Sequence, residues 1–168
     1  MEKKVANIIE QKNKFFFILK KPCFPNIRKF FSKNKNILIM TNTEIVQQCY
    51  ADFGQGNIPG LINAMSEDII WVDPGQNVGN LYKGTRKGKA EVMEFFKTLP
   101  GEVTITNFEI RSLSETGDKV FVEGFIGGHS TLKKIDVSSD WLMVWQIQNE
   151  KVVYHHLYLD TAALAAAL

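Results

Sequence analysis

The sequence predicts an α+β fold in which a curved antiparallel sheet wraps around three N-terminal helices. Two observations support this prediction. From residue 41 to residue 99 the apolar residues recur mainly with the 3.6-residue period of helices, whereas after residue 102 the period changes to two, as in strands. The expected order is helix, helix, strand, helix and then four strands, which is typical of an α+β domain rather than of repeated βαβ units.

The first expected helix begins at a capping box, in which Thr41 or Thr43 precedes Glu44. Residues 54–56, Gly-Gln-Gly, end it. Pro59 then lies in the first turn of a second, short helix. The apolar residues of the two helices follow the helical period: Ile45, Val46, Cys49, Tyr50 and Phe53 in the first, and Leu61, Ile62 and Met65 at the second.

A polar, glycine-bearing loop is expected over residues 78–89, ahead of the third helix. It carries four basic residues, Lys83, Arg86, Lys87 and Lys89. Such a loop before a helix can hold a phosphate, but this one matches neither the P-loop nor the dinucleotide-binding fingerprint. We therefore interpret it as a solvated basic loop. The third helix is expected over residues 89–99 and should stop at Pro100-Gly101.

Two hairpins and a closing turn make up the rest of the chain. Turn signals at residues 116–118 and at Asn149-Glu150 join the strands of each hairpin. The expected strands are Val103–Leu113 with Lys119–Ile126, and Ser139–Gln148 with Lys151–Leu159. The alanine-rich run Thr161–Leu168 is expected to form one closing helical turn.

Alternation divides each of the last two strands into two faces. One face of the penultimate strand carries Trp141, Met143, Trp145 and Ile147. These large side chains fit either a packed core or the wall of an apolar pocket. On the last strand one face carries His155, Leu157 and Leu159, and the other carries Tyr154, His156, Tyr158 and Asp160. The two leucines favour an inward direction for the first set.

Asp73 is the charged residue that most needs an explanation. In Asp68-Ile-Ile-Trp-Val-Asp-Pro-Gly75, alternation places Ile69, Trp71 and Asp73 on one face of a short strand. If that face borders a cavity, desolvation disfavours the charged carboxylate and turns it into a general base or acid near neutral pH. The alternative is a strand end in water, because Asp-Pro-Gly is also a turn signal.

Residues 1–39 differ from the rest of the chain in charge and composition. They hold ten Lys/Arg and two Asp/Glu, a net charge of about +8, whereas residues 40–168 hold ten and sixteen, about −6. Lys, Asn, Phe and Ile, which share A/T-rich codons, occupy 26 of these 39 positions. We interpret residues 1–39 as translated upstream sequence or a disordered tail before a native start at Met40. A basic surface-binding arm and a targeting segment are the alternatives.

Several classes of partner and site are not expected. The acidic balance of residues 40–168 argues against nucleic acid. The apolar run of residues 15–19 is too short for a signal peptide or a membrane span. Cys23 and Cys49 indicate no disulfide framework, so we expect a cytoplasmic protein. The three histidines, His129, His155 and His156, lack metal-ligand spacing, because neighbours on a strand point to opposite faces.

A series of short motifs runs in one order from Met40 to Leu168. They are Ile45-Val-Gln-Gln-Cys-Tyr50 with Gly56-Asn57, Asp68-Ile-Ile-Trp71 with Pro74-Gly75, Tyr82-Lys-Gly84 with Gly88 before Phe95-Phe96, Trp141 through Trp145, Lys151-Val-Val153 and Tyr158-Leu-Asp-Thr-Ala-Ala163. In this order they resemble the SnoaL-like polyketide cyclase group of the NTF2-like superfamily, which includes ketosteroid isomerase and limonene epoxide hydrolase. The resemblance implies a cone-shaped barrel with a deep apolar pocket between sheet and helices, a homodimer through the outer face of the sheet, and no metal or organic cofactor.

The resemblance also implies roles for individual residues. Counted from Gly56, Asp73 falls where the isomerase branch carries its proton-shuttling aspartate, and His155 falls on a pocket-facing position. The tyrosine and the second acid of that branch correspond to Cys49 and Leu142, so steroid isomerisation is not expected.

The sequence therefore predicts a pocket for an apolar, carbonyl-bearing small molecule. As a cofactor-free isomerase, cyclase or hydrolase, the protein would use Asp73 to move a proton. His155 would donate a hydrogen bond to the developing oxyanion or orient Asp73. The expected wall consists of Tyr50, Trp71, Trp141, Met143, Trp145 and Leu157. The alternatives are a non-catalytic ligand-binding or dimerisation module and a protein-interaction adaptor that uses Tyr154, His156 and Tyr158.

Overall fold

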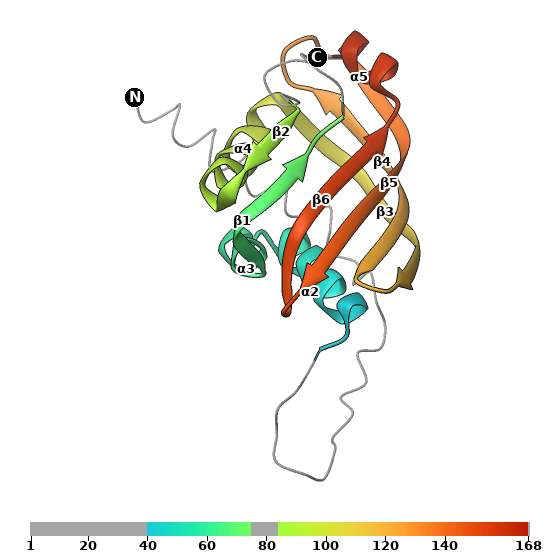
Figure 1. Cartoon of the computed structure of the whole chain (residues 1–168). Coiled ribbons are helices and arrows are strands. Elements are labelled where there is room, and N and C mark those ends of the chain that lie inside the picture. Colours follow the sequence, from blue (N-terminus) through green and yellow to red (C-terminus); the bar gives the residue numbers. More distant parts are fainter. Residues whose placement is uncertain (1–39, 75–83, 168) are drawn as a thin grey trace.

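The computed structural model describes residues 40–74 and 84–167, so the predicted N-terminal extension, residues 1–39, lies outside the described residues. The described residues form four helices and one six-stranded sheet, which confirms the predicted α+β class (Figure 1). The elements are α2 (Asn42–Gln55), α3 (Ile58–Asn63), β1 (Met65–Val72), β2 (Thr85–Lys87), α4 (Gly88–Glu102), β3 (Val103–Thr116), β4 (Lys119–Ser130), β5 (Asp136–Gln148), β6 (Lys151–Leu159) and α5 (Thr161–Ala167).

The strands follow the order β2-β1-β6-β5-β4-β3. In Figure 1, β3 to β6 are long strands that curve side by side, and α4 lies beside β1 and β2. The sheet is antiparallel, as predicted, at every neighbouring pair except β1 and β6, which run parallel. The parallel pairing places Trp71 on β1 beside His155 on β6, so residues from the first and last strands are neighbours in the sheet.

The helix starts are as predicted, but the region around α4 differs. Thr41 and Glu44 form the capping box of α2, and Gly56 ends that helix with φ 73°. The predicted end of the third helix at Pro100-Gly101 is wrong, because α4 continues to Glu102. Pro100 is tolerated there because it lies in the last turn and its missing N–H removes only one hydrogen bond.

The predicted polar loop over residues 78–89 is wrong where the structure describes it. Thr85–Lys87 forms the edge strand β2, which pairs with β1, and residues 78–83 lie outside the described residues. Along β2 the side chains alternate between exposed, buried and exposed. The middle side chain, Arg86, is therefore turned towards the interior.

The hairpins of the second half form at the predicted turns. Asn149 and Glu150 both have positive φ, 51° and 59°, as the two-residue type I′ turn requires. The bounds of β6 agree with the prediction, while β3, β4 and β5 are longer than expected. The predicted end of β4 at Ile126 is wrong, because Gly127 and Gly128 continue its pairing with β3 and β5.

The interior lies between the concave sheet and the helices. The inward residues include Ile69 and Trp71 on β1, Asp73 directly after the end of β1, and Trp141, Trp145 and Ile147 on β5. On β6 His155 and Leu157 are buried, which confirms the predicted inward set. None of the helices within residues 40–74 and 84–167 combines the length and the hydropathy needed to span a bilayer.

Gly124 on β4 is the glycine whose replacement should cost most in the sheet. A Cβ atom at this position would collide with the Glu109 carbonyl oxygen and the Trp141 ring. We expect Gly124→Ala to lower the free energy of unfolding by about 2 kcal/mol through overpacking. Gly127→Ala is the matched control, because its Cβ would lie 3.5 Å from the Asn107 Cβ, an ordinary contact. Urea unfolding of both variants checks the prediction, and equal losses would contradict it.

Candidate functional site

A pocket lies between the inner face of the sheet and the helices. Its cavity volume is about 80 Å³, which is below the roughly 300 to 1,000 Å³ of drug-sized ligand pockets, so the cavity is a small one. Seven of the eight residues predicted for the site line it: Tyr50, Trp71, Asp73, Met143, Trp145, His155 and Leu157. The other lining residues were not predicted for the site: Cys49, Phe53, Leu61, Phe95, Phe96, Leu99, Ile105, Phe108 and Ile126.

Trp141, the eighth predicted residue, is not part of this lining. It is buried and stacks on Phe108 with ring centres 5.2 Å apart, and its ring centre lies 6.3 Å from that of Tyr50. Trp141 thus supports two residues of the wall from behind, which is the core alternative for this residue. Alternation predicted correctly that Trp141 points inward. It could not show whether an inward residue fills the core or lines the pocket, because both kinds of residue recur with the same period.

Asp73 is buried at the pocket and not solvated in a turn. Its residue exposure is 3%, so the alternative of a strand end in water is wrong. The Trp71 Nε1 donates a hydrogen bond to Asp73 Oδ1 over 2.9 Å, and Arg86 forms an ion pair with Oδ2. The Asp73 backbone N–H also donates to the Gly84 carbonyl oxygen over 3.0 Å. The carboxylate is therefore held by two partners, and the backbone of Asp73 is held by a third contact.

Arg86 is the residue of the site that the sequence prediction missed. Its interpretation as part of a solvated basic loop is wrong, since its side chain is 10% exposed and pairs with Asp73. The guanidinium lies over the Phe95 ring, 4.6 Å from its centre. Burial lowers the pKa of Arg86, with an opposing effect of Glu91, but arginine stays protonated at physiological pH. Its positive charge compensates an ionised carboxylate in apolar surroundings.

His155 lies flat against Trp71, with ring centres 3.7 Å apart and an angle of 18° between the planes. The edge of Trp145 closes the other side at 4.5 Å. Burial, with a smaller effect of His156, lowers the pKa of His155 to about 3, so the imidazole is neutral at physiological pH. The recorded contacts of the Asp73 carboxylate are with Trp71 and Arg86 and not with His155.

Tyr50 connects α2 to the floor of the pocket. Its hydroxyl accepts a hydrogen bond from Trp145 Nε1 over 3.1 Å and donates one to Met143 Sδ over 3.1 Å. Burial raises the pKa of Tyr50, and burial with the nearby Asp52 charge raises the pKa of Cys49 to about 12. Both groups are therefore protonated near neutral pH, and Cys49 is a poor nucleophile.

The three histidines lie in separate places. His155 lines the pocket, whereas His129 contacts Asp136 at 2.6 Å near exposed strand ends. His156 lies beside Tyr154 on the outer face of the sheet. Within residues 40–74 and 84–167, no group of three His, Cys, Asp or Glu side chains is placed to hold a metal ion.

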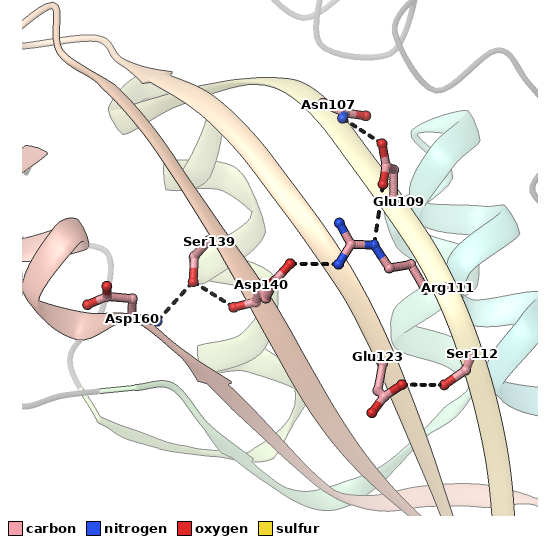
Figure 2. A network of polar contacts seen from close by, with 8 residues as sticks. All are labelled: Asn107, Glu109, Arg111, Ser112, Glu123, Ser139, Asp140 and Asp160. Carbon is pink, nitrogen blue, oxygen red and sulfur yellow. Dashed lines mark hydrogen bonds and ion pairs between the residues drawn. The ribbon is translucent and has the colours of Figure 1, made fainter.

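The sheet also carries a network of solvent-exposed charges, shown in Figure 2. Arg111 contacts Asp140 at 2.7 Å and Glu109 at 3.5 Å, and Ser112 donates a hydrogen bond to Glu123 over 2.8 Å. The Arg111 side chain is 51% exposed, so water screens these pairs and they add little to stability. The apolar pocket is thus the better candidate for a functional site.

Burial of His155 predicts a pH dependence of stability. The group titrates near 6.5 in the unfolded chain and near 3 in the folded one. Between these values the unfolded state binds more protons, so stability should fall as the pH falls from 6.5. A His155→Phe variant lacks this proton uptake, so its free energy of unfolding should fall less steeply with falling pH. The slopes of the wild type and the variant should differ by up to about 1.4 kcal/mol per pH unit. Denaturant unfolding from pH 7 to pH 4.5 measures both slopes; parallel slopes would contradict the prediction.

Comparison with known proteins places this site in a family. The SnoaL-like domain matches residues 46–155. An NTF2-like protein from Burkholderia xenovorans LB400 is 31% identical, with a TM-score of 0.69 over 75% of this chain and 94% of that chain. TerC, co-crystallised with polyporic acid, is 28% identical, with a TM-score of 0.62 over 75% and 96%.

An NTF2-like protein from Burkholderia thailandensis E264 shares the fold, with a TM-score of 0.70, 21% identity and coverage of 77% of this chain and 98% of that chain. No match was found among curated proteins. The family match spans more than half of the chain, from within α2 to His155 in β6. The chain therefore belongs to the SnoaL-like domain family of the NTF2-like superfamily.

Proposed function

We propose that the protein binds an apolar, carbonyl-bearing small molecule in the pocket and, as an enzyme, transfers a proton without a cofactor. The observation that carries the proposal is the pocket itself, whose apolar wall surrounds one carboxylate and one neutral imidazole. Pockets of this make-up bind small molecules, and their few polar groups fix the ligand's orientation. The co-crystallisation of TerC with polyporic acid supports a ligand-binding role.

In the proposed reaction Asp73 accepts the proton and returns it to another atom of the substrate. Arg86 favours the ionised carboxylate, and Trp71 fixes the direction of Oδ1. An N–H of His155 donates to the oxygen on which negative charge develops. The reaction classes that fit are isomerisation, cyclisation and hydrolysis, because a base can start each of them: it removes a proton from the carbon beside a carbonyl in the first two and from the attacking water in the third.

A non-catalytic ligand-binding protein is the second candidate, and one observation favours it. Both oxygens of Asp73 already have partners, Oδ1 with Trp71 and Oδ2 with Arg86. A base that is held in this way has less capacity left to abstract a proton. This candidate predicts that a ligand binds in the pocket and leaves unchanged.

We also propose a homodimer through the outer face of the sheet. Three aromatic side chains of β6 lie there in a row, and Tyr158 is 48% exposed. His156 stacks on Tyr158 with ring centres 3.9 Å apart and contacts the Tyr154 hydroxyl at 3.0 Å. Exposed aromatic rows of this kind are typical anchors of protein interfaces.

Native mass spectrometry of the purified full chain tests these proposals together. We expect a dimer that carries a bound small molecule, and quenching of tryptophan fluorescence when the uncharged ketone acetophenone is added, because Trp71 and Trp145 line the pocket. Tyr158→Glu is the control, since it should release monomers that still bind the ligand. A monomer that carries no ligand and takes up no acetophenone would contradict both proposals.

A further inference from the structure

His155 is the polar side chain of the pocket that has hydrogen-bonding capacity to offer. The residue is 1% exposed, and neither Nδ1 nor Nε2 has a hydrogen-bond partner among the described residues. Buried polar atoms without a partner are rare, because leaving them unpaired is costly. His155 lines the pocket, so a ligand bound there can supply the missing partner.

The other polar groups of the pocket are engaged with protein atoms. The Tyr50 hydroxyl accepts from Trp145 and donates to Met143. The Asp73 carboxylate accepts from Trp71 and pairs with Arg86. Selection among ligands by hydrogen bonding therefore falls mainly to His155.

The surroundings of His155 determine what the imidazole can bind. Stacking on Trp71 and contact with the edge of Trp145 restrict the plane of the ring. Because burial lowers its pKa to about 3, the ring is neutral and has one N–H donor and one acceptor nitrogen. A neutral imidazole donates to a carbonyl or accepts from a hydroxyl, and it offers no charge to an anion.

The charges at the pocket also argue against an ionic ligand. Asp73 and Arg86 compensate each other, so a ligand with its own charge would be buried without a counter-charge. The rings of Trp71, Phe96 and Trp145 present faces and edges to one another, with centres about 6 Å apart. Such walls favour a flat ring that stacks against them.

We propose that the ligand is an uncharged, flat molecule that presents one carbonyl or hydroxyl oxygen to the imidazole of His155. This inference rests on the proposed function, because it assumes that the pocket binds a small molecule. It adds the charge state and the shape of the ligand to the hydrogen bond from His155.

Three probes of nearly one shape test the inference. Acetophenone carries a carbonyl oxygen, α-methylstyrene replaces that oxygen by a CH₂ group, and benzoate carries a charge. Each is titrated into the full chain, and binding is followed by the NMR signals of the tryptophan indoles and of the ¹⁵N-labelled imidazoles. The ratio of the acetophenone and α-methylstyrene Kd values is then compared between the wild type and His155→Phe, which cancels the difference in hydrophobicity between the probes.

We expect His155→Phe to shift this ratio roughly tenfold against acetophenone. In the wild type, acetophenone should move an imidazole nitrogen signal that α-methylstyrene leaves in place, and benzoate should bind far more weakly than either. His129→Phe, an exposed site away from the pocket lining, should keep the wild-type ratio.

An unchanged ratio, an unmoved imidazole signal or tight binding of benzoate would overturn this inference alone. If no probe binds the wild type, the proposed function fails with it. The imidazole signals of the wild type keep the test decisive even if His155→Phe does not fold.

Discussion

Replacing Arg86 by methionine should lower the free energy of unfolding by about 3 kcal/mol. The change leaves the Asp73 carboxylate, whose side chain is 1% exposed, without its positive partner in an apolar pocket. Removing one member of a buried ion pair typically costs 3–5 kcal/mol, because the remaining charge keeps its desolvation penalty and loses its compensation. Methionine retains the apolar volume of the arginine stem, so the loss of packing against Phe95 should be small.

Two variants separate this charge effect from packing. Arg86→Met with Asp73→Asn removes both charges and should recover most of the lost stability, since no uncompensated ion remains. Lys89→Met removes the exposed pair with Glu67 and should change stability by less than about 1 kcal/mol. Denaturant unfolding at pH 7 of the wild type, Arg86→Met, Asp73→Asn and the double variant gives the coupling energy, and Lys89→Met is measured beside them. A double variant no more stable than Arg86→Met would show that the ion pair is not the cause.

The inward faces of the strands could be predicted because alternation is a local property. A period of two sets Trp71 with Asp73, and Trp145 with Trp141, whatever the partner strands are. The capping box at Thr41 and the turn at Asn149 are local in the same sense, and both form as predicted. The sequence thus predicted the elements other than β2, and seven of the sixteen residues that line the pocket, since large apolar residues on an inward face either fill the core or line its cavity.

The partners of the site residues could not be predicted because they depend on non-local pairing. Asp73 meets Arg86 only because β2 turns back along β1 as an edge strand, and a strand of three residues is too short to show an alternating pattern. His155 meets Trp71 only because β6 pairs parallel to β1 across most of the chain length. Periodicity carries no information on such pairings between distant strands. The sequence could therefore predict that Asp73 lies on an inward face, but it could not predict that Arg86 is its partner.

The geometry also changes the chemical interpretation of Asp73. Desolvation alone would favour a protonated carboxyl group, whereas the guanidinium of Arg86 favours the ionised form. An ionised carboxylate accepts a proton and does not donate one, so Asp73 fits the role of base in the first step. Its conjugate acid then returns the proton, which the neighbouring positive charge assists.

With a substrate in hand, Asp73→Asn should lower kcat roughly 10²- to 10⁴-fold, because an amide cannot accept the proton. The amide oxygen can still accept from Trp71, so the wall should keep its shape and KM should change little. Steady-state kinetics at saturating substrate measure the effect. Asp73→Asn with Arg86→Met is the second protein to assay, since it removes the strain of an unpaired guanidinium and isolates the loss of the base.

Tyr50→Phe serves as the matched pocket control for this prediction. It removes a hydroxyl that is bonded to Trp145 and Met143 and leaves the ring in place. Because that hydroxyl takes no part in the proposed proton transfer, its loss should alter KM more than kcat. Unchanged turnover in Asp73→Asn would remove Asp73 from the mechanism and favour the ligand-binding function. A loss of kcat in Tyr50→Phe as large as in Asp73→Asn would instead show that the geometry of the pocket, and not the carboxylate, limits the rate.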